Sequence, residues 1–181
     1  MRRVGLLLMG LGLVCLAASG GLTAKNRAED SRAGAASAQI LASLEAAPPE
    51  TIPAEDNSQT YFGRLAIPRL GLELPVLPEW SYEDLKIAPC RYSGSIGDGD
   101  LVLIAHNYRT HFGPIRRLKP GDQVVFEDLD GTVFEYRVAA VEVIPPTALE
   151  EVTAGIHDLS LITCTYGGKT RLVVYCDAVE P

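Results

Sequence analysis

The chain has 181 residues, 47% of them hydrophobic and 22% charged, which is enough for one domain with a buried core plus a tail. A formal net charge of −7 argues against a surface that follows nucleic-acid phosphates, so we expect no nucleic-acid partner. The four cysteines form no C-x-x-C pair, which argues against structural zinc; three lie outside the N-terminal apolar run, so at least one free thiol is predicted among Cys90, Cys164 and Cys176.

Residues 1–23 are predicted to be a signal or a transmembrane anchor. Arg2 and Arg3 precede a charge-free run over 4–22, close to the ~20 residues that cross a bilayer as a helix. The arginines predict a cytoplasmic N-terminus and an extracellular body, which makes a single-pass protein of the cell membrane. Cleavage after the small residues 17–19 is the alternative, and the length of the run favours an uncleaved anchor.

Residues 24–60 are predicted to be a flexible linker that is part helical. The segment is rich in Ala, Ser, Glu and Pro and poor in aromatic residues, a composition that cannot pack a core. One helix is expected over 35–46, where Ile40 lies on a weak apolar face, and prolines at 48 and 49 end it. We expect a spacer between the membrane and a folded domain over 61–181.

The folded domain is predicted to begin with two short strands within residues 61–80. Pro68 and Gly71 separate the two strands. A helical turn follows, for which Ser81 is the expected N-cap with Asp84 three residues later.

The middle of the domain alternates between loops and strands. The Gly, Ser and Asp content of 90–100 predicts a loop, and 101–107 is an apolar strand that ends near His106. A short helix is expected over 111–118, and a hairpin over 123–144 turns at Asp130-Gly131. Many short strands with little helix predict a mainly β fold, a closed or nearly closed barrel.

A second hairpin, over 158–176, carries the most informative chemistry. Gly167-Gly168 forms its turn, and the pairing places Cys164 close to Arg171. A thiol beside a guanidinium is a nucleophile with an anion stabiliser. The alternative is that Cys164 is a small buried hydrophobe and Arg171 a solvated strand charge.

His106 is the predicted partner of the thiol. It ends an apolar strand, as Cys164 does, and two strand ends at one rim of a barrel can bring imidazole and thiol together. Imidazole can accept the thiol proton and later protonate a leaving amine. A structural role for this histidine is the alternative, and His111 and His157 lie in loop-like sequence.

Four segments in the right order resemble the sortase family. The segment LVLIAHNYRTHFGPIRRLKPGDQVVFEDLDGTVFEY resembles the pattern around the sortase histidine, and SLITC at 160–164 resembles the T-L-x-T-C box. Arg171 matches the arginine on the next strand, and RLAIPRLGLELPV resembles the opening strand. The resemblance covers about 61–179. Ala105 and Ser160 depart from the usual Gly and Thr, and Tyr175 stands where a second arginine is frequent.

The resemblance implies a sortase-like eight-stranded β-barrel with short helices, preceded by a membrane helix. It implies a cysteine transpeptidase that cleaves a C-terminal L-P-x-T-G-like sorting signal of surface proteins. Cys164 would attack the carbonyl, His106 would transfer protons and Arg171 would stabilise the oxyanion. The expected acceptor is an amine of a peptidoglycan precursor or a pilin, and the chemistry needs no metal or organic cofactor.

The resemblance also implies that Thr163, Ala105 and Asn107 lie against the substrate. A cysteine hydrolase that uses water, and a tethered barrel that only binds peptide or wall polymer, remain alternatives. Cys90 and Cys176 either pair or stay reduced. A loop with three acidic residues is either a calcium site of the kind some sortases have or a solvated connection: Glu150, Glu151 and Asp158.

Overall fold

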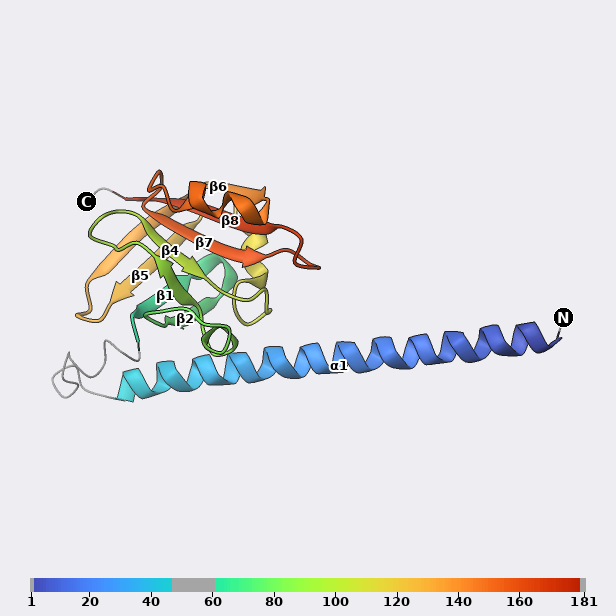
Figure 1. Cartoon of the computed structure of the whole chain (residues 1–181). Coiled ribbons are helices and arrows are strands. Elements are labelled where there is room, and N and C mark those ends of the chain that lie inside the picture. The colour runs from blue at the N-terminus through green and yellow to red at the C-terminus, as the bar shows by residue number, and fades with distance from the viewer. Residues whose placement is uncertain (1, 47–60, 180–181) are drawn as a thin grey trace.

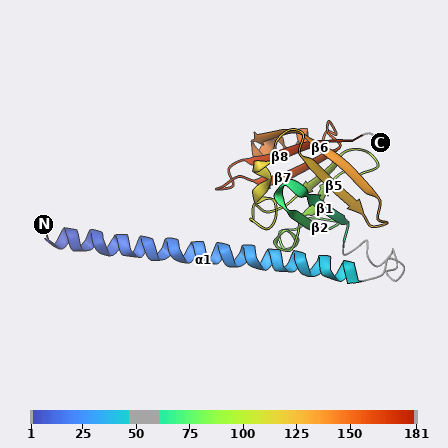
Figure 2. The same ribbon diagram turned by 180° about the vertical axis from the view of Figure 1, so that it is seen from behind.

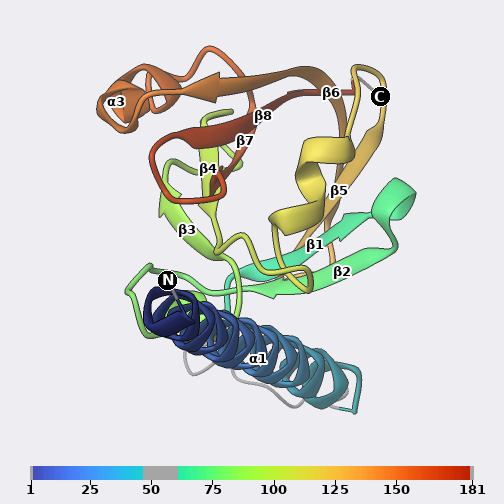
Figure 3. The same cartoon turned by 90° about the vertical axis from the view of Figure 1, so that its right-hand side faces the viewer.

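The computed structural model describes residues 2–46 and 61–179, which form one long helix and one β domain. Helix α1 (Arg2–Ala46) runs along one side of the domain, and its N-terminal half projects well beyond it (Figures 1 and 2). Seen from the N-terminal end of α1, the strands curve around a common interior and α1 lies beneath β1 and β2 (Figure 3).

The domain is an eight-stranded sheet with the order β2-β1-β5-β6-β8-β7-β4-β3. Neighbouring strands are antiparallel except for β4 and β7, which are parallel. A bridge between Leu77 and Cys90 joins the two ends of the sheet, so the barrel is nearly closed, as predicted. The strands are β1 Gly63–Ile67, β2 Leu72–Val76, β3 Cys90–Ser93, β4 Leu101–Ile104, β5 Gln123–Asp128, β6 Val133–Ile144, β7 Leu159–Cys164 and β8 Arg171–Ala178.

Short helical turns connect the strands, and those at η2 and η3 match the two predicted above: η1 Pro68–Leu70, η2 Asp84–Lys86, η3 Gly113–Arg117, η4 Pro146–Ala148 and α3 Leu149–Val152. The Ser81 hydroxyl accepts the backbone N–H of Asp84 at 3.0 Å, the bond predicted for a cap, although the N-cap position of η2 itself is Glu83. The predicted loop over 90–100 is wrong at its start. Residues 90–93 form strand β3, and the Gly, Ser and Asp residues that indicated a loop follow it.

The strands separate a main core from a second apolar layer. Leu161 of β7 and Val174 of β8 point into the main core, which also contains the fully buried Phe126. Ile162 and Val173 are their neighbours in sequence and point the other way, into a smaller cluster. This alternation is the period of two that a strand imposes on its side chains.

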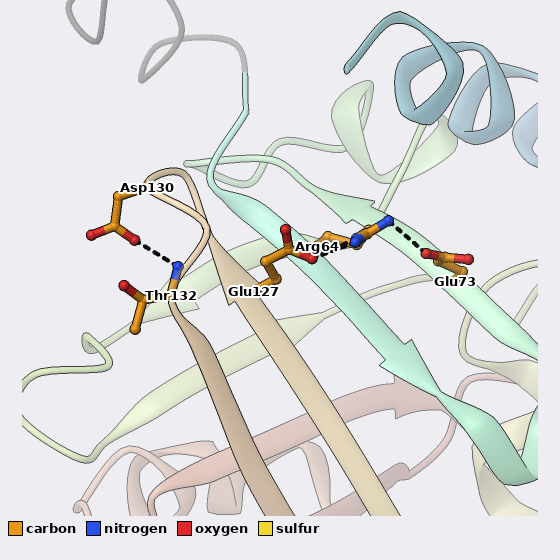
Figure 4. Close-up of polar contacts among 5 residues, drawn as sticks. All are labelled: Arg64, Glu73, Glu127, Asp130 and Thr132. Carbon is orange, nitrogen blue, oxygen red and sulfur yellow. Dashed lines mark hydrogen bonds and ion pairs between the residues drawn. The ribbon is translucent and has the colours of Figure 1, made fainter. Parts of the chain in front are cut away.

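Arg64 fastens three strands together on the outside of the barrel (Figure 4). Its guanidinium forms an ion pair with Glu127 of β5 and another, at 2.8 Å, with Glu73 of β2. Nearby, the carboxylate of Asp130 accepts the backbone N–H of Thr132 at 2.9 Å and shapes the predicted β5–β6 turn. Charge-assisted bonds to both neighbours thus hold β1 in place.

Helix α1 is longer than the helix predicted over 35–46, because it continues without a break from Arg2 to Ala46. Its N-terminal part is long and apolar enough to cross a membrane, and its apolar side chains make no contact with the domain; Leu7, for example, is 73% exposed. Its C-terminal part is docked on the domain through the buried residues Ala33 and Ser37. Residues 47–60 lie outside the described residues.

We expect Phe126→Ala to lower the free energy of unfolding by about 3–5 kcal/mol, because it empties a fully buried site in the main core. The ring packs closely against the backbone of Gly63, where an added Cβ would lie only 2.3 Å from it. Urea unfolding followed by the fluorescence of Trp80, the one tryptophan, measures the change. Val133→Ala, at a 55% exposed position, should cost less than about 0.5 kcal/mol.

Candidate active site

The β7–β8 hairpin brings Cys164 and Arg171 together. They are direct partners in the register, so their side chains lie on the same face of the sheet. The turn between them uses Gly167 and Gly168 with φ of 84° and 71°, a conformation that favours glycine. The Arg171 Nη1 group donates to the carbonyls of Gly168 and Thr170 at 3.0 and 3.2 Å, which holds the guanidinium over the turn.

The parallel pairing of β4 with β7 brings the histidine to the same end. Ile104 pairs with Ile162, and the Ala105 N–H donates to the Ile162 carbonyl at 3.1 Å, so pairing continues past the end of β4. One residue further along, His106 comes level with Cys164. Adjacent strands are ~4.8 Å apart, and residues level with each other in a parallel pair point to the same face. Cys164 and Arg171 are thus direct neighbours, and His106 leaves β4 at the same end of the sheet.

The site lies on the face of the sheet opposite the main core. Cys164, His106 and Arg171 are each partly exposed, and the apolar cluster of Val102, Ile162 and Val173 lies directly below them on the same face. The thiol and imidazole are thus half-shielded from water and remain open to a ligand from outside.

The electrostatics of His106 come from its burial and from two neighbouring elements. Partial burial lowers the pKa of His106 below its ordinary value, because a desolvated imidazole resists charging. The positive charge of Lys86 on η2 lowers the pKa further, while Glu29 on α1 acts in the opposite direction. The neutral imidazole, which can accept a thiol proton, is favoured.

The two other histidines lie elsewhere and have other partners. His157 Nδ1 is 2.6 Å from a carboxylate oxygen of Asp177, at the opposite end of β8. His111 is fully buried beneath α1, and burial lowers its pKa to about 4. Its Nε2 is 3.2 Å from the hydroxyl of Ser37, whereas its Nδ1 is buried without a partner among the described residues.

The three residues expected to lie against a substrate differ in exposure. Thr163 is buried, and its hydroxyl donates to the carbonyl of Ala105 at 2.8 Å. Ala105 is also buried, within the main core, so both side chains form the seam between β7 and the segment after β4. Asn107 is partly exposed next to His106.

The remaining body cysteines are buried and unpaired. Cys90 and Cys176 are both free thiols, and burial raises the pKa of each to about 12. A thiol with such a pKa stays protonated and unreactive. Cys164 is the partly exposed cysteine of the described β domain.

No cluster of three or more His, Cys, Asp or Glu side chains suited to a metal ion occurs among the described residues. In the acidic loop, Asp158 accepts the backbone N–H of Ala178 at 2.7 Å.

Three neighbours of the site were not anticipated from the sequence. The ring of Tyr108 packs between His106 and His111, with centroid distances of 5.0 and 5.6 Å. Arg116 of η3 lies 4.9 Å over the ring of Tyr166 and ties the β7–β8 turn to the rest of the rim. These contacts, like those of Lys86 and Glu29, depend on tertiary packing and leave no local sequence signal.

A nearly closed β-barrel that carries a partly exposed thiol, an imidazole and a guanidinium at one strand end has the groups that thiol-dependent acyl transfer requires. The chain belongs to the sortase family, whose members are cysteine transpeptidases: the family model for the sortase domain matches residues 65–179. The match covers nearly the whole described β domain.

Individual relatives agree with this assignment. The chain is 31% identical to sortase A of Bacillus anthracis over 131 residues, which is 68% of this chain and 62% of the relative. Among solved structures, sortase C1 of the GBS pilus island 1 superposes with a TM-score of 0.60, 22% identity and coverage of 86% of this chain and 85% of that one. Listeria monocytogenes sortase A gives 0.62 and 23%, with 67% and 88% covered. These structures share the fold.

We expect Lys86→Gln to raise the pKa of His106 towards its ordinary value, because it removes a positive charge that disfavours the imidazolium. An NMR titration of the histidine ring signals measures this pKa directly. Lys119→Gln, on an exposed turn, is the matched control and should leave it unchanged. An unchanged His106 titration in the Lys86 variant would contradict the assigned cause.

We expect His111 to make the protein less stable as the pH falls from 6.5 to about 4. In that range the unfolded chain binds a proton at His111 that the folded chain does not, so stability drops by on the order of 3 kcal/mol. His111→Gln keeps an N–H donor but does not titrate, and its urea stability should fall less over this range. If the free energies of unfolding of the two proteins fall equally with pH, His111 titrates normally in the folded state and the prediction is wrong.

Proposed function

We propose that the protein is a membrane-anchored sortase that cleaves an LPxTG-like C-terminal sorting signal and transfers the acyl group to an amine of the cell wall. The observation that carries the proposal is the register of three adjacent strands. Cys164 is paired with Arg171, and the last β4–β7 pair, Ile104 with Ile162, lies two residues before His106 and Cys164, which supports a common position for the imidazole and the thiol. The membership of the chain in the sortase family supports the same reaction class.

In the first half-reaction, the sulfur of Cys164 attacks the carbonyl carbon before the scissile bond. The thiol proton goes to His106, whose neutral form is favoured by its lowered pKa. The carbonyl π electrons move to oxygen and form a tetrahedral oxyanion. When that intermediate collapses, the C–N bond breaks, His106 returns its proton to the leaving amine, and a thioester remains on Cys164.

In the second half-reaction, an incoming amine attacks the thioester carbonyl. His106 removes a proton from the amine nitrogen, the C–S bond breaks, and the departing sulfur takes that proton from His106, which restores the Cys164 thiol and the neutral imidazole. The product is a new amide bond. Oxidation states do not change in either half-reaction, so no redox partner is needed.

Arg171 is proposed to stabilise the oxyanion in both half-reactions. Its Nη1 is held by the carbonyls of the turn, and a guanidinium carries five N–H donors. The donors on Nε and Nη2 are therefore left for the oxyanion. Since lysine lacks this planar fork, Arg171→Lys should not restore the activity lost in Arg171→Ala.

The proposed partners are surface proteins with a sorting signal and an amine of a peptidoglycan precursor. The Arg2-Arg3 pair before the apolar run supports a cytoplasmic N-terminus, with the catalytic domain outside the cell. Asn107 is partly exposed beside His106 and is the proposed side-chain contact to the substrate. Thr163 and Ala105 are proposed to act indirectly, because their hydrogen bond holds the backbone next to His106 and Cys164.

We expect the full-length protein to cleave one or more peptides of a sorting-signal panel, and Cys164→Ala and His106→Ala to lower the rate by more than about 10³-fold, because both groups take part in every turnover. Mass spectrometry with triglycine or a diaminopimelate amine as acceptor identifies the ligated product. Cys90→Ala, at a buried protonated thiol, is the matched control and should keep its activity.

Each other outcome has a clear meaning. Cleavage without any ligated product in the presence of either amine would identify water as the acceptor and a hydrolase in place of a transpeptidase. Ligation to a pilin lysine alone would exclude the cell-wall amine. No cleavage of any peptide, together with no alkylation of Cys164 by a peptide vinyl sulfone, would refute the proposal.

A further inference from the structure

The membrane helix makes direct contact with the loop that carries the candidate catalytic histidine. The loop over 106–113 folds back on itself, and the Phe112 N–H donates to the carbonyl of His106 at 3.2 Å. One side of this loop lies against α1, so the helix is part of the surroundings of His106 even though about 70 residues separate them in sequence.

The first contact joins Asp30 of α1 to Thr110. The Asp30 carboxylate accepts the backbone N–H of Thr110 at 3.0 Å and lies 2.8 Å from its hydroxyl, which can also donate to the Asp30 carbonyl at 3.0 Å. Gly34 makes this approach possible, because a Cβ there would lie 2.7 Å from the Thr110 methyl group. The Asp30 carboxylate thus binds the loop backbone, and Gly34 leaves the space that this contact needs.

The second contact joins Ser37 of α1 to His111. The Ser37 hydroxyl donates to the carbonyl of Ile87 at 2.7 Å, so its oxygen is left to accept from His111 Nε2 at 3.2 Å. This arrangement requires a proton on Nε2, and the lowered pKa of His111 favours the neutral ring. Both side chains are buried, so the bond is shielded from water and from competing partners.

The contacts reach His106 through a series of neighbouring, mutually tilted rings. Tyr108 packs against His111 on one side and against His106 on the other. A displacement of Thr110 or His111 would therefore move Tyr108 and, with it, the imidazole that stands level with Cys164.

We infer that Asp30 and Ser37 are positioning residues for His106, so that the membrane helix completes the active site. This inference rests on the proposed function. The helix then has two roles along its length: its apolar half meets the membrane, and its docked half sets the orientation of the proton-transfer group.

The test compares variants of the full-length protein in detergent micelles. Asp30→Ala should lower kcat for peptide cleavage by between about 10- and 100-fold with KM changed less than about twofold, because it misplaces a reacting group and leaves the peptide contacts intact. Asp30→Asn keeps the acceptor oxygen and should restore kcat to within about threefold of the wild type. Arg32→Ala, exposed on the same helix, is the matched control.

Histidine ring NMR spectra give a readout that does not depend on turnover. The chain has three histidines, and His157 lies far from α1 as an internal control. Asp30→Ala and Gly34→Leu should shift the His106 and His111 signals and leave those of His157 in place. Shifts at all three histidines, or a kcat loss that Asn does not rescue, would indicate general destabilisation and overturn the inference.

Wild-type kcat and unchanged His106 signals in both Asp30→Ala and Gly34→Leu would also overturn it. If the wild-type protein cleaves no peptide, the proposed function fails. The histidine spectra would still decide whether α1 sets the environment of His106.

Discussion

The structure depends above all on one parallel pairing, between β4 and β7. A parallel pair places the same ends of two strands side by side, so the residues that leave β4 and β7 emerge at one place. The hydrogen bond from Thr163 to the carbonyl of Ala105 extends this pairing by a residue beyond β4, where strands ordinarily begin to separate. Because it is buried, the bond is well protected, and the imidazole and the thiol follow directly after the two residues that it joins.

Burial distinguishes Cys164, which is partly exposed, from Cys90 and Cys176, which are buried. Cys90 and Cys176 are buried among apolar side chains, where the thiolate would be poorly solvated. Cys164 occupies the last position of β7, at the boundary between an apolar layer and solvent. One fold thus protects two thiols and presents a third without any disulfide among the described cysteines.

Much of the β domain was predictable because its signals are local. Glycines at 131, 167 and 168 supply the positive φ values of two tight turns, and the Gly167-Gly168 turn sets the register of Cys164 against Arg171. Strand β3 was not predicted because it is short and pairs mainly with β4. The full extent of α1 was not predicted because its docked half has small residues in place of an apolar stripe. The docked half of α1 lies close to the domain because small residues face it: Ala33, Gly34 and Ser37. The need for small residues depends on the surface of the folded domain, which the local sequence does not show.

The unbroken course of α1 has a geometric consequence for where the protein works. At a rise of 1.5 Å per residue, Asp30 lies about 12 Å along the axis from Leu22, the last residue of the charge-free run. In the proposed membrane-anchored protein, a flexible tether would let the domain take many heights and orientations, whereas docking on a continuous helix would keep the domain within a thin layer parallel to the bilayer. Encounters with molecules held in that layer would then take place in two dimensions, and a tilt of the membrane-embedded part of α1 would also tilt the Asp30–Thr110 contact near His106.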